Sequence, residues 1–363
     1  MSKIPRALIF ATLLLGACAV ILPATFSPLE AAPDQGTNLS RIPKPITASI
    51  PEPCDRACLL DVVDSYFKAM ASRCPCGLPL AQNIKYTENG QLVTPGEGIW
   101  KTFTGRGTYR IYLADPESGE AGYYGDILEF GRLKGMVAMR LKIKGHQIVE
   151  VEAIIARQEL RPKGGLGKNT AGIMTPILLD EPDPSGFISP DVTLLEPLSK
   201  DQRTPRAEMI EATKKYLQAF EQKNASITPF ASECTIRENG MAATNNPSGP
   251  VVDPAHPDFH VFGGSCAQEI TQGYFAGIEK PRDAFPLLVD QEQGLVLNLA
   301  LFDNEGNVKS VNVPGVGAVA VPRNLLRPIT FLKPQLFKIE AGKIREIDGL
   351  SWPVPFGMSS GWQ

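Results

Sequence analysis

The 363-residue chain has little net charge and no cluster of basic residues. Its formal net charge is −3, from 36 Lys and Arg against 39 Asp and Glu. Proteins that bind nucleic acid neutralise its phosphates with clustered Lys and Arg, and no such run occurs in this sequence. The sequence therefore argues against a nucleic-acid partner.

Motifs for phosphates and dinucleotides are also missing. The chain contains neither Gly-x-x-x-x-Gly-Lys-Ser/Thr nor Gly-x-Gly-x-x-Gly, so a kinase or a nicotinamide enzyme lacks support. We expect no serine hydrolase and no cofactor. Only three histidines are present, and two of them, His256 and His260, lie beside Pro254 and Pro257. Two prolines exclude the helix that usually presents paired histidines to a metal, so we expect no metal site.

The N-terminus has the pattern of a targeting signal. Lys3 and Arg6 precede an uncharged apolar run from Ala7 to Leu22, which predicts a signal peptide over residues 1–32 and a secreted or periplasmic protein. One alternative is an uncleaved anchor, because the apolar stretch approaches the ~20 residues that span a bilayer. Another is a lipoprotein box, which Leu15-Gly-Ala-Cys18 resembles, although the residues after Cys18 are apolar where such boxes are usually followed by polar ones. We favour cleavage, and expect membrane association only if the segment is retained.

The cysteines fit an oxidising compartment. Six remain beyond Cys18, namely Cys54, Cys58, Cys74, Cys76, Cys234 and Cys266. An even number in an exported chain indicates disulfides, and the spacings do not match a zinc site. We expect Cys234 to pair with Cys266, whereas the other four allow three connectivities.

Part of the sequence recurs at an offset of 150. The matching residues are Tyr66, Ala69, Pro79, Ala81, Glu88, Asn89 and Gly90 with Tyr216, Ala219, Pro229, Ala231, Glu238, Asn239 and Gly240. In each copy an apolar helical pattern precedes short strands, the first copy ending in an antiparallel meander. We therefore predict an α+β protein of two tandem cone-like domains, over 51–160 and 204–363, each a helical segment packed on a curved antiparallel sheet. Residues 33–50 form a linker and 161–203 the interdomain connection.

The repeat resembles the nuclear transport factor 2-like superfamily, which includes SnoaL-like polyketide cyclases, ketosteroid isomerase and scytalone dehydratase. Over residues 51–362 the chain is more closely similar to an exported tandem-domain family of unknown function. The residues that carry this resemblance are Cys54-Asp-Arg-Ala-Cys58-Leu, Tyr86-Thr-Glu-Asn-Gly90, Cys234-Thr-Ile-Arg-Glu-Asn-Gly240, Cys266-Ala-Gln-Glu, Phe337-Lys-Ile-Glu and Pro355-Phe-Gly-Met-Ser-Ser-Gly-Trp362. The resemblance implies a cone with an internal pocket, but no position reproduces the catalytic residues of the named enzymes.

Glu88 and Glu238 are the candidate catalytic residues. Strand alternation places each on the apolar face of its strand, where desolvation would raise the pKa of the carboxyl group into the range of a general base. The competing interpretation assigns Glu-Asn-Gly to a turn at the strand end, and it is favoured because both copies need the same turn. Candidate substrate-binding residues are Tyr86, Asn89, Trp100, Tyr109, Asn239 and Asn298.

These observations predict an exported protein that binds a small hydrophobic molecule. As an enzyme it would be a cofactor-independent isomerase, cyclase or lyase acting on a small hydrophobic carbonyl or polyketide-like compound. The alternative is a non-catalytic secreted binding or interaction module whose cones are filled by their own side chains. A homodimer is compatible with either interpretation.

Overall fold

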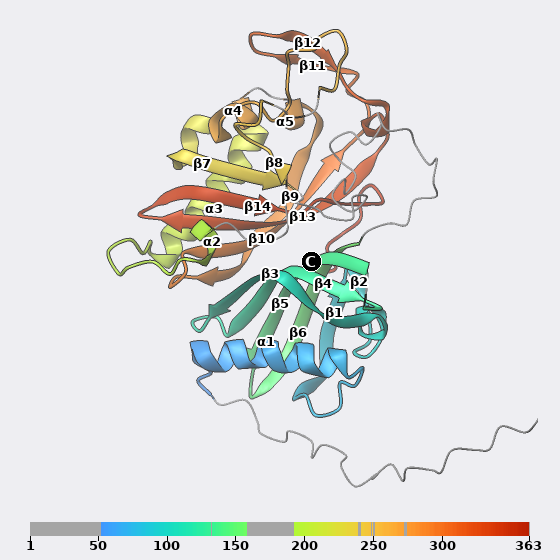
Figure 1. Cartoon of the computed structure of the whole chain (residues 1–363), viewed down its shortest axis with the longest axis vertical. Coiled ribbons are helices and arrows are strands. Elements are labelled where there is room, and N and C mark those ends of the chain that lie inside the picture. The colour runs from blue at the N-terminus through green and yellow to red at the C-terminus, as the bar shows by residue number, and fades with distance from the viewer. Residues whose placement is uncertain are drawn as a thin grey trace, which may run out of the picture. The chain divides into compact units, whose positions relative to one another are not determined.

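The computed structural model is described for seven stretches of the chain: residues 52–131, 133–157, 192–238, 241–247, 249, 251–271 and 274–362. Residues 44–363 form one compact unit that contains two large sheets, each accompanied by helices (Figure 1). The predicted α+β class is confirmed. The expected signal peptide, the linker and most of the interdomain connection lie outside the described residues. Within the described stretches, no helix is long and apolar enough to cross a membrane.

The first half contains one long helix and a six-stranded sheet. Its elements are α1 (Arg56–Ala71), β1 (Leu80–Glu88), β2 (Gln91–Leu92), the 3-10 helix η1 (Gly98–Lys101), β3 (Phe103–Asp115), β4 (Glu120–Glu129), β5 (Leu133–Lys144) and β6 (Gln147–Arg157). The strand order is β2-β1-β6-β5-β4-β3. All neighbours pair antiparallel except β1 and β6, which run parallel.

The second half has the same strand order with additional elements. It comprises α2 (Val192–Leu195), α3 (Arg206–Gln222), η4 (Ala225–Ile227), β7 (Phe230–Glu238), β8 (Met241–Ala242), α4 (Cys266–Thr271), α5 (Tyr274–Ile278), β9 (Lys280–Asp290), β10 (Leu295–Asn304), β11 (Ser310–Val313), β12 (Gly317–Ala320), η5 (Arg323–Leu325), β13 (Ile329–Glu340), β14 (Lys343–Gly349) and β15 (Trp352–Val354). The main path is β8-β7-β14-β13-β10-β9, again with one parallel pair, β7 and β14. The strand β15 pairs with β13, and β11 with β12 forms a separate hairpin.

Each long helix begins at a defined residue and buries one apolar side. Asp55 caps α1 by accepting the backbone N–H of Cys58 at 2.9 Å, which satisfies a donor that the helix leaves free. The sequence predicts Thr204 as the cap of α3, with Pro205 inside the helix. In the structure Pro205 is the cap residue, and the Thr204 hydroxyl instead accepts the backbone N–H of Gly342 at 2.9 Å.

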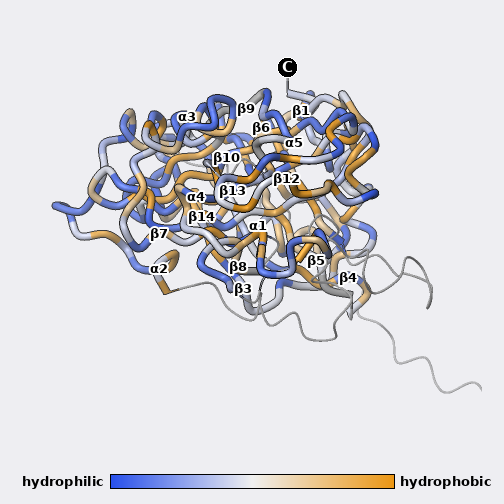
Figure 2. The backbone as a smooth tube through the Cα atoms, turned by 90° about the horizontal axis from the view of Figure 1, so that it is seen from above, coloured by the Kyte–Doolittle hydropathy of each residue, from blue (hydrophilic) through white to orange (hydrophobic). Residues whose placement is uncertain are grey.

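The helix and one face of the sheet enclose a hydrophobic core in each half. In the first core, Tyr66 and Phe67 of α1 lie against strand residues such as Tyr123 and Val151; in the second, Tyr216 packs on Phe337. Figure 2 shows hydrophobic segments along strands such as β10 and hydrophilic segments in many of the connecting turns. The interior of each cone is therefore the helix-facing side of its sheet.

The other faces of the two sheets pack against each other. A cluster of buried side chains joins β3, β4 and β5 to the strands of the second sheet and to Leu350, which follows β14: Tyr109, Ile111, Leu113, Tyr124, Met136 and Ala138 with Leu288, Leu295, Leu297, Leu336 and Leu350. Within this layer the hydroxyls of Tyr109 and Tyr124 donate hydrogen bonds to the buried carboxylate of Asp348. Burial raises the pKa of Asp348 to about 6, although these hydrogen bonds oppose the shift.

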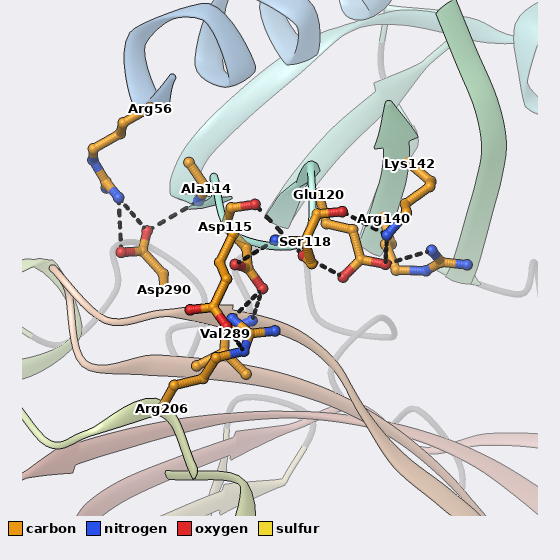
Figure 3. A network of polar contacts seen from close by, with 11 residues as sticks. Arg56, Ala114, Asp115, Ser118, Glu120, Arg140, Lys142, Arg206, Val289 and Asp290 are labelled. Atoms are coloured by element: carbon orange, nitrogen blue, oxygen red, sulfur yellow. Dashed lines mark hydrogen bonds and ion pairs between the residues drawn. The ribbon is translucent and has the colours of Figure 1, made fainter. Parts of the chain in front are cut away.

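Two equivalent polar contacts flank this sheet-to-sheet layer (Figure 3). Arg56, at the start of α1, bonds Asp290 of β9 at 2.7 Å, while Arg206, at the start of α3, bonds Asp115 of β3 at 2.6 Å. The same aspartates accept backbone N–H groups across the interface. Asp290 accepts from Ala114, and Asp115 accepts from Val289. Each half thus makes the same kind of contact with the other through equivalent residues, as the two subunits of a twofold-symmetric dimer do.

The C-terminal segment returns to the first sheet. The indole N–H of Trp362 donates to the hydroxyl of Thr87 on β1 at 2.9 Å. Its ring lies under the guanidinium of Arg140 and the ammonium of Lys85, 4.8 and 4.3 Å from the ring centroid. These cation–π contacts attach the C-terminal segment, which follows the strands of the second sheet, to the first sheet.

All six cysteines of the described residues form disulfides. Cys234 pairs with Cys266, as predicted, and ties β7 to α4. The alternatives left open in the first half resolve to Cys54–Cys58 and Cys74–Cys76. Three disulfides are typical of proteins that fold in an oxidising compartment.

Candidate functional site

In the first cone, Glu88 is bonded to its own part of the fold. One carboxylate oxygen accepts the hydroxyl of Tyr86 and the backbone N–H of Ile99, the latter at 2.8 Å. Burial raises the pKa of Glu88, and these two hydrogen bonds partly offset the rise. The contact with Ile99 fixes the start of η1, which is the turn-like role that the sequence favours.

Asn89 and Trp100 are likewise occupied by structural contacts. Asn89 has a positive φ of 47°, and its side chain bonds both the N–H and the C=O of Ile155, at 2.7 and 3.0 Å. Trp100 is fully buried, and its indole N–H donates to the hydroxyl of Tyr66 at 3.3 Å. Both residues therefore stabilise the first cone with groups that a ligand would need.

The interior of the first cone is almost full. A cavity of about 10 Å³ remains, counted as space for the centres of water-sized molecules, which is about enough for one water. Its lining is aromatic and aliphatic: Tyr66, Phe67, Met70, Tyr86, Ile99, Ile127, Val137, Met139, Val151 and Ala153. This cone is plugged by its own side chains.

The strand registers identify the corresponding positions in the second cone. Glu88 pairs with Ala153, which pairs with Met139, which pairs with Tyr123. In the second sheet the same path runs from Glu238 through Gly349 and Gln335 to Asn298. Gln335 and Asn298 thus occupy the places of Met139 and Tyr123, and two residues earlier on the same strand Lys333 occupies that of Val137.

These polar replacements surround a larger cavity. In the second cone the space for the centres of water-sized molecules is about 40 Å³, which is room for three or four waters. Because each water occupies about 30 Å³ in the liquid, the same space could hold a ligand of roughly 100 Å³, the size of a six-membered ring. Its lining combines apolar walls with four hydrogen-bonding or charged groups and a tyrosine: Phe220, Ile236, Ala243, Phe262, Phe275 and Phe302 with Glu238, Glu269, Lys333, Gln335 and Tyr216. An apolar cavity with a few convergent polar groups is the usual form of a ligand site.

Lys333 is the positive centre of this cavity. Its ammonium bonds Glu279 at 2.8 Å and lies 3.6 Å from the nearer carboxylate oxygen of Glu238. Burial lowers the pKa of Lys333, but the charges of Glu279 and Glu238 outweigh burial, so the pKa is raised and the ammonium persists. Of the two glutamates, Glu279 is fully buried behind the ammonium, whereas Glu238 lines the cavity.

Glu269 supplies a second carboxyl group with the opposite tendency. It projects from α4, which the Cys234–Cys266 disulfide holds against β7. Burial raises the pKa of Glu269 well above its ordinary value, the charge of Glu238 adds to the rise, and Lys333 opposes it. The site thus combines Glu269, a carboxyl group whose pKa burial raises, with Glu238, a carboxyl group that lies beside the ammonium of Lys333, and such a pairing suits acid–base chemistry.

Several polar atoms near this cavity are buried without a hydrogen-bond partner among the described residues. They are one oxygen each of Glu238, Glu279 and Gln335, and both the oxygen and the nitrogen of Asn298. Gln335 uses its nitrogen to bond the hydroxyl of Tyr216 at 3.3 Å. Buried polar atoms are nearly always paired, so the unpaired amide atoms of Gln335 and Asn298 indicate a missing partner such as a bound molecule.

The remaining predicted site residues do not share one site. Tyr109 faces the sheet-to-sheet layer and bonds Asp348, so it lines neither of the two cavities. Tyr86 lies inside the first cone, next to Glu88. Asn239 falls outside the described residues. Asn298 is fully buried beside Gln335, on the helix-facing side of the second sheet.

The structure adds residues that the sequence did not single out. These are Lys333, Gln335 and Glu279, together with Glu269, which the sequence offers only as the last residue of Cys266-Ala-Gln-Glu. The signal that could have revealed them is the comparison of the two copies at positions of equal register. Although the sequence predicts no serine hydrolase, Gly357-Met-Ser-Ser-Gly361 has the Gly-x-Ser-x-Gly spacing of a hydrolase nucleophile. This stretch lies in turns after β15. A catalytic serine of this motif sits between a strand and a helix, so the stretch lacks the structure that such a serine needs.

Across the described residues, no group of three or more His, Cys, Asp or Glu side chains is arranged to hold an ion. His256 and His260 bond Asp253 and the carbonyl of Gly249 instead.

One family model is similar to part of the chain. A family model described as "Domain of unknown function (DUF8021)" matches residues 202–351, which is the second half. No curated protein matches the chain. Among solved structures, a "putative polyketide cyclase" from Silicibacter sp. TM1040 aligns with 40% of this chain and 89% of its own, at 11% identity and a TM-score of 0.25.

Proposed function

We propose that the chain is an exported protein whose second cone binds a small, largely apolar carbonyl compound and catalyses proton transfer on it without a cofactor. The observation that carries this proposal is the cavity of the second cone, which Glu238, Glu269 and Lys333 line, whereas the first cone holds Glu88 in a structural contact and is filled by its own side chains. The three disulfides support export. We also propose that the two halves arose by duplication of a single domain.

Each charged group has a defined part in this chemistry. The Glu238 carboxylate takes a proton from the carbon next to the substrate carbonyl. The ammonium of Lys333 stabilises the negative charge that develops on the carbonyl oxygen. Glu269, whose pKa burial raises, returns a proton at a second position. Isomerisation, cyclisation and elimination all use this sequence of steps.

The duplicated glutamate provides a matched control. We would measure exchange of the α-protons of cyclohexanone in D2O by proton NMR, with the native protein, Glu238→Gln and Glu88→Gln. Native protein should exceed buffer, and Glu238→Gln should lower the rate by about 100-fold or more, the usual contribution of a general base. Glu88→Gln keeps an oxygen that can accept from Ile99 and should leave the rate unchanged.

The rival function predicts a different result. If cyclohexanone binds but its protons exchange no faster than in buffer, the second cone binds a ligand without catalysis. The chain would then be a binding module, and the filled interior of the first cone agrees with such a role. Equal rates for the two variants would remove Glu238 from the mechanism.

A further inference from the structure

Two neighbouring carboxamides in the second cone are unusual for a protein interior. Asn298 is fully buried and Gln335 is 3% exposed, and three of their four amide atoms have no hydrogen-bond partner among the described residues. Leaving a buried donor or acceptor unpaired is costly, so such groups call for an explanation. The equivalent positions in the first cone, Tyr123 and Met139, leave no amide unpaired.

The two carboxamides lie side by side. Asn298 of β10 and Gln335 of β13 are directly opposite in the antiparallel register, so their Cβ atoms lie roughly 5 Å apart on the same face. Gln335 lines the cavity and its nitrogen is held by Tyr216, which leaves its oxygen as an acceptor. Asn298, immediately beside that lining, offers a donor and an acceptor.

We infer that the ligand of the second cone carries a secondary amide within a ring, with its N–H and C=O on the same edge. The N–H donates to the oxygen of Gln335, and the C=O accepts from the nitrogen of Asn298. A ring of this kind also suits the roughly 100 Å³ of space and the aromatic wall of Phe262, Phe275 and Phe302. This inference rests on the proposed function and names the class of its carbonyl compound, a lactam or a related cyclic amide.

The charges of the site exclude the other group with the same shape. A carboxylic acid also presents a donor and an acceptor on one edge, but at neutral pH it ionises. Lys333, the one ammonium among the residues that line the cavity, already faces two carboxylates, Glu279 at 2.8 Å and Glu238 at 3.6 Å. A carboxylate would therefore meet repulsion that a neutral amide avoids.

The test uses two ligands of nearly the same shape, 2-piperidone and cyclohexanone, which differ by one N–H in place of CH₂. We would titrate each into native protein, Asn298→Leu and Tyr123→Phe, and follow binding by ligand-observed NMR. We expect native protein and Tyr123→Phe to bind the lactam at least ten-fold more tightly than the ketone. Asn298→Leu should reduce that preference to about two-fold or less, without lowering the thermal midpoint, because the removed amide had no partner.

Three results would overturn the inference. Equal affinities in native protein would mean that the amides do not recognise the ligand. A lower thermal midpoint for Asn298→Leu with the lactam preference intact would mean that the two amides serve the fold. No binding of either probe would mean that the cavity takes only water. Since α-proton exchange is measured on the ketone alone, its failure would remove the proposed catalysis while leaving the lactam preference to stand or fall separately.

Discussion

Replacing Lys333 by Met should destabilise the protein through the glutamate that it leaves behind. In the native structure the ammonium bonds Glu279, whose side chain is fully buried. Breaking a buried ion pair by removing one partner typically costs about 3–5 kcal/mol, because the remaining charge is unpaired in a poorly solvated site. We expect a loss of that order in the free energy of unfolding, measured by urea titration with tryptophan fluorescence.

The loss should depend on pH in a definite direction. Burial already raises the pKa of Glu279, and the charge of Lys333 opposes the rise, so the variant should raise it further. A carboxyl group whose pKa is higher in the folded than in the unfolded state does not lower the free energy of unfolding at pH values below both pKa values. As pH rises between the two pKa values, the free energy of unfolding falls by up to about 1.4 kcal/mol per pH unit. The deficit of Lys333→Met should therefore be larger at pH 8 than at pH 5.

A double variant isolates the cause. Lys333→Met with Glu279→Leu removes the buried charge together with its partner, and should recover most of the stability and lose the pH dependence. A loss below about 1 kcal/mol for the single variant, equal at both pH values, would refute the assignment of Lys333 as the counter-ion of Glu279.

Two further predictions concern the interface and a disulfide. Because the pKa of Asp348 is about 6 in the fold and about 3.9 when unfolded, native stability should fall by up to about 3 kcal/mol as pH rises from 4 to 7. Asp348→Asn should remove that part of the pH profile, and an unchanged profile would contradict it. The bond between Cys234 and Cys266 spans 32 residues, so replacing both by Ala should cost about 2–4 kcal/mol and speed amide hydrogen exchange in α4. Unaltered exchange there would mean that α4 is held in place by packing alone.

Local patterns were sufficient to predict much of the second cone's framework. Alternation along β7 correctly placed Glu238 on the same face as buried Ile236, and the count of cysteines correctly paired Cys234 with Cys266. Both inferences depend on short-range geometry, either the two-residue period of a strand or the pairing of a small even set.

The decisive strand of the site escaped prediction for a physical reason. All of β13 except its last residue, Glu340, is buried, so it has no alternation to detect. It also carries Pro334 in its interior, which normally argues against a central strand, and Lys333 and Gln335 look like surface residues in the sequence. Their burial follows from long-range pairing with β10 and β14, which no local pattern contains.

The sheet-to-sheet layer has a consequence for how the chain can be divided. The family match over residues 202–351 suggests a separable module, yet a fragment with those ends would leave Leu288, Leu297 and Leu336 without the side chains that cover them. It would also lose the segment that carries Trp362 to the first sheet. Exposed leucine surfaces of this kind promote self-association. The smallest piece that should behave as a monomer in dilute solution is therefore the whole pair of cones, and the two halves should unfold in one transition.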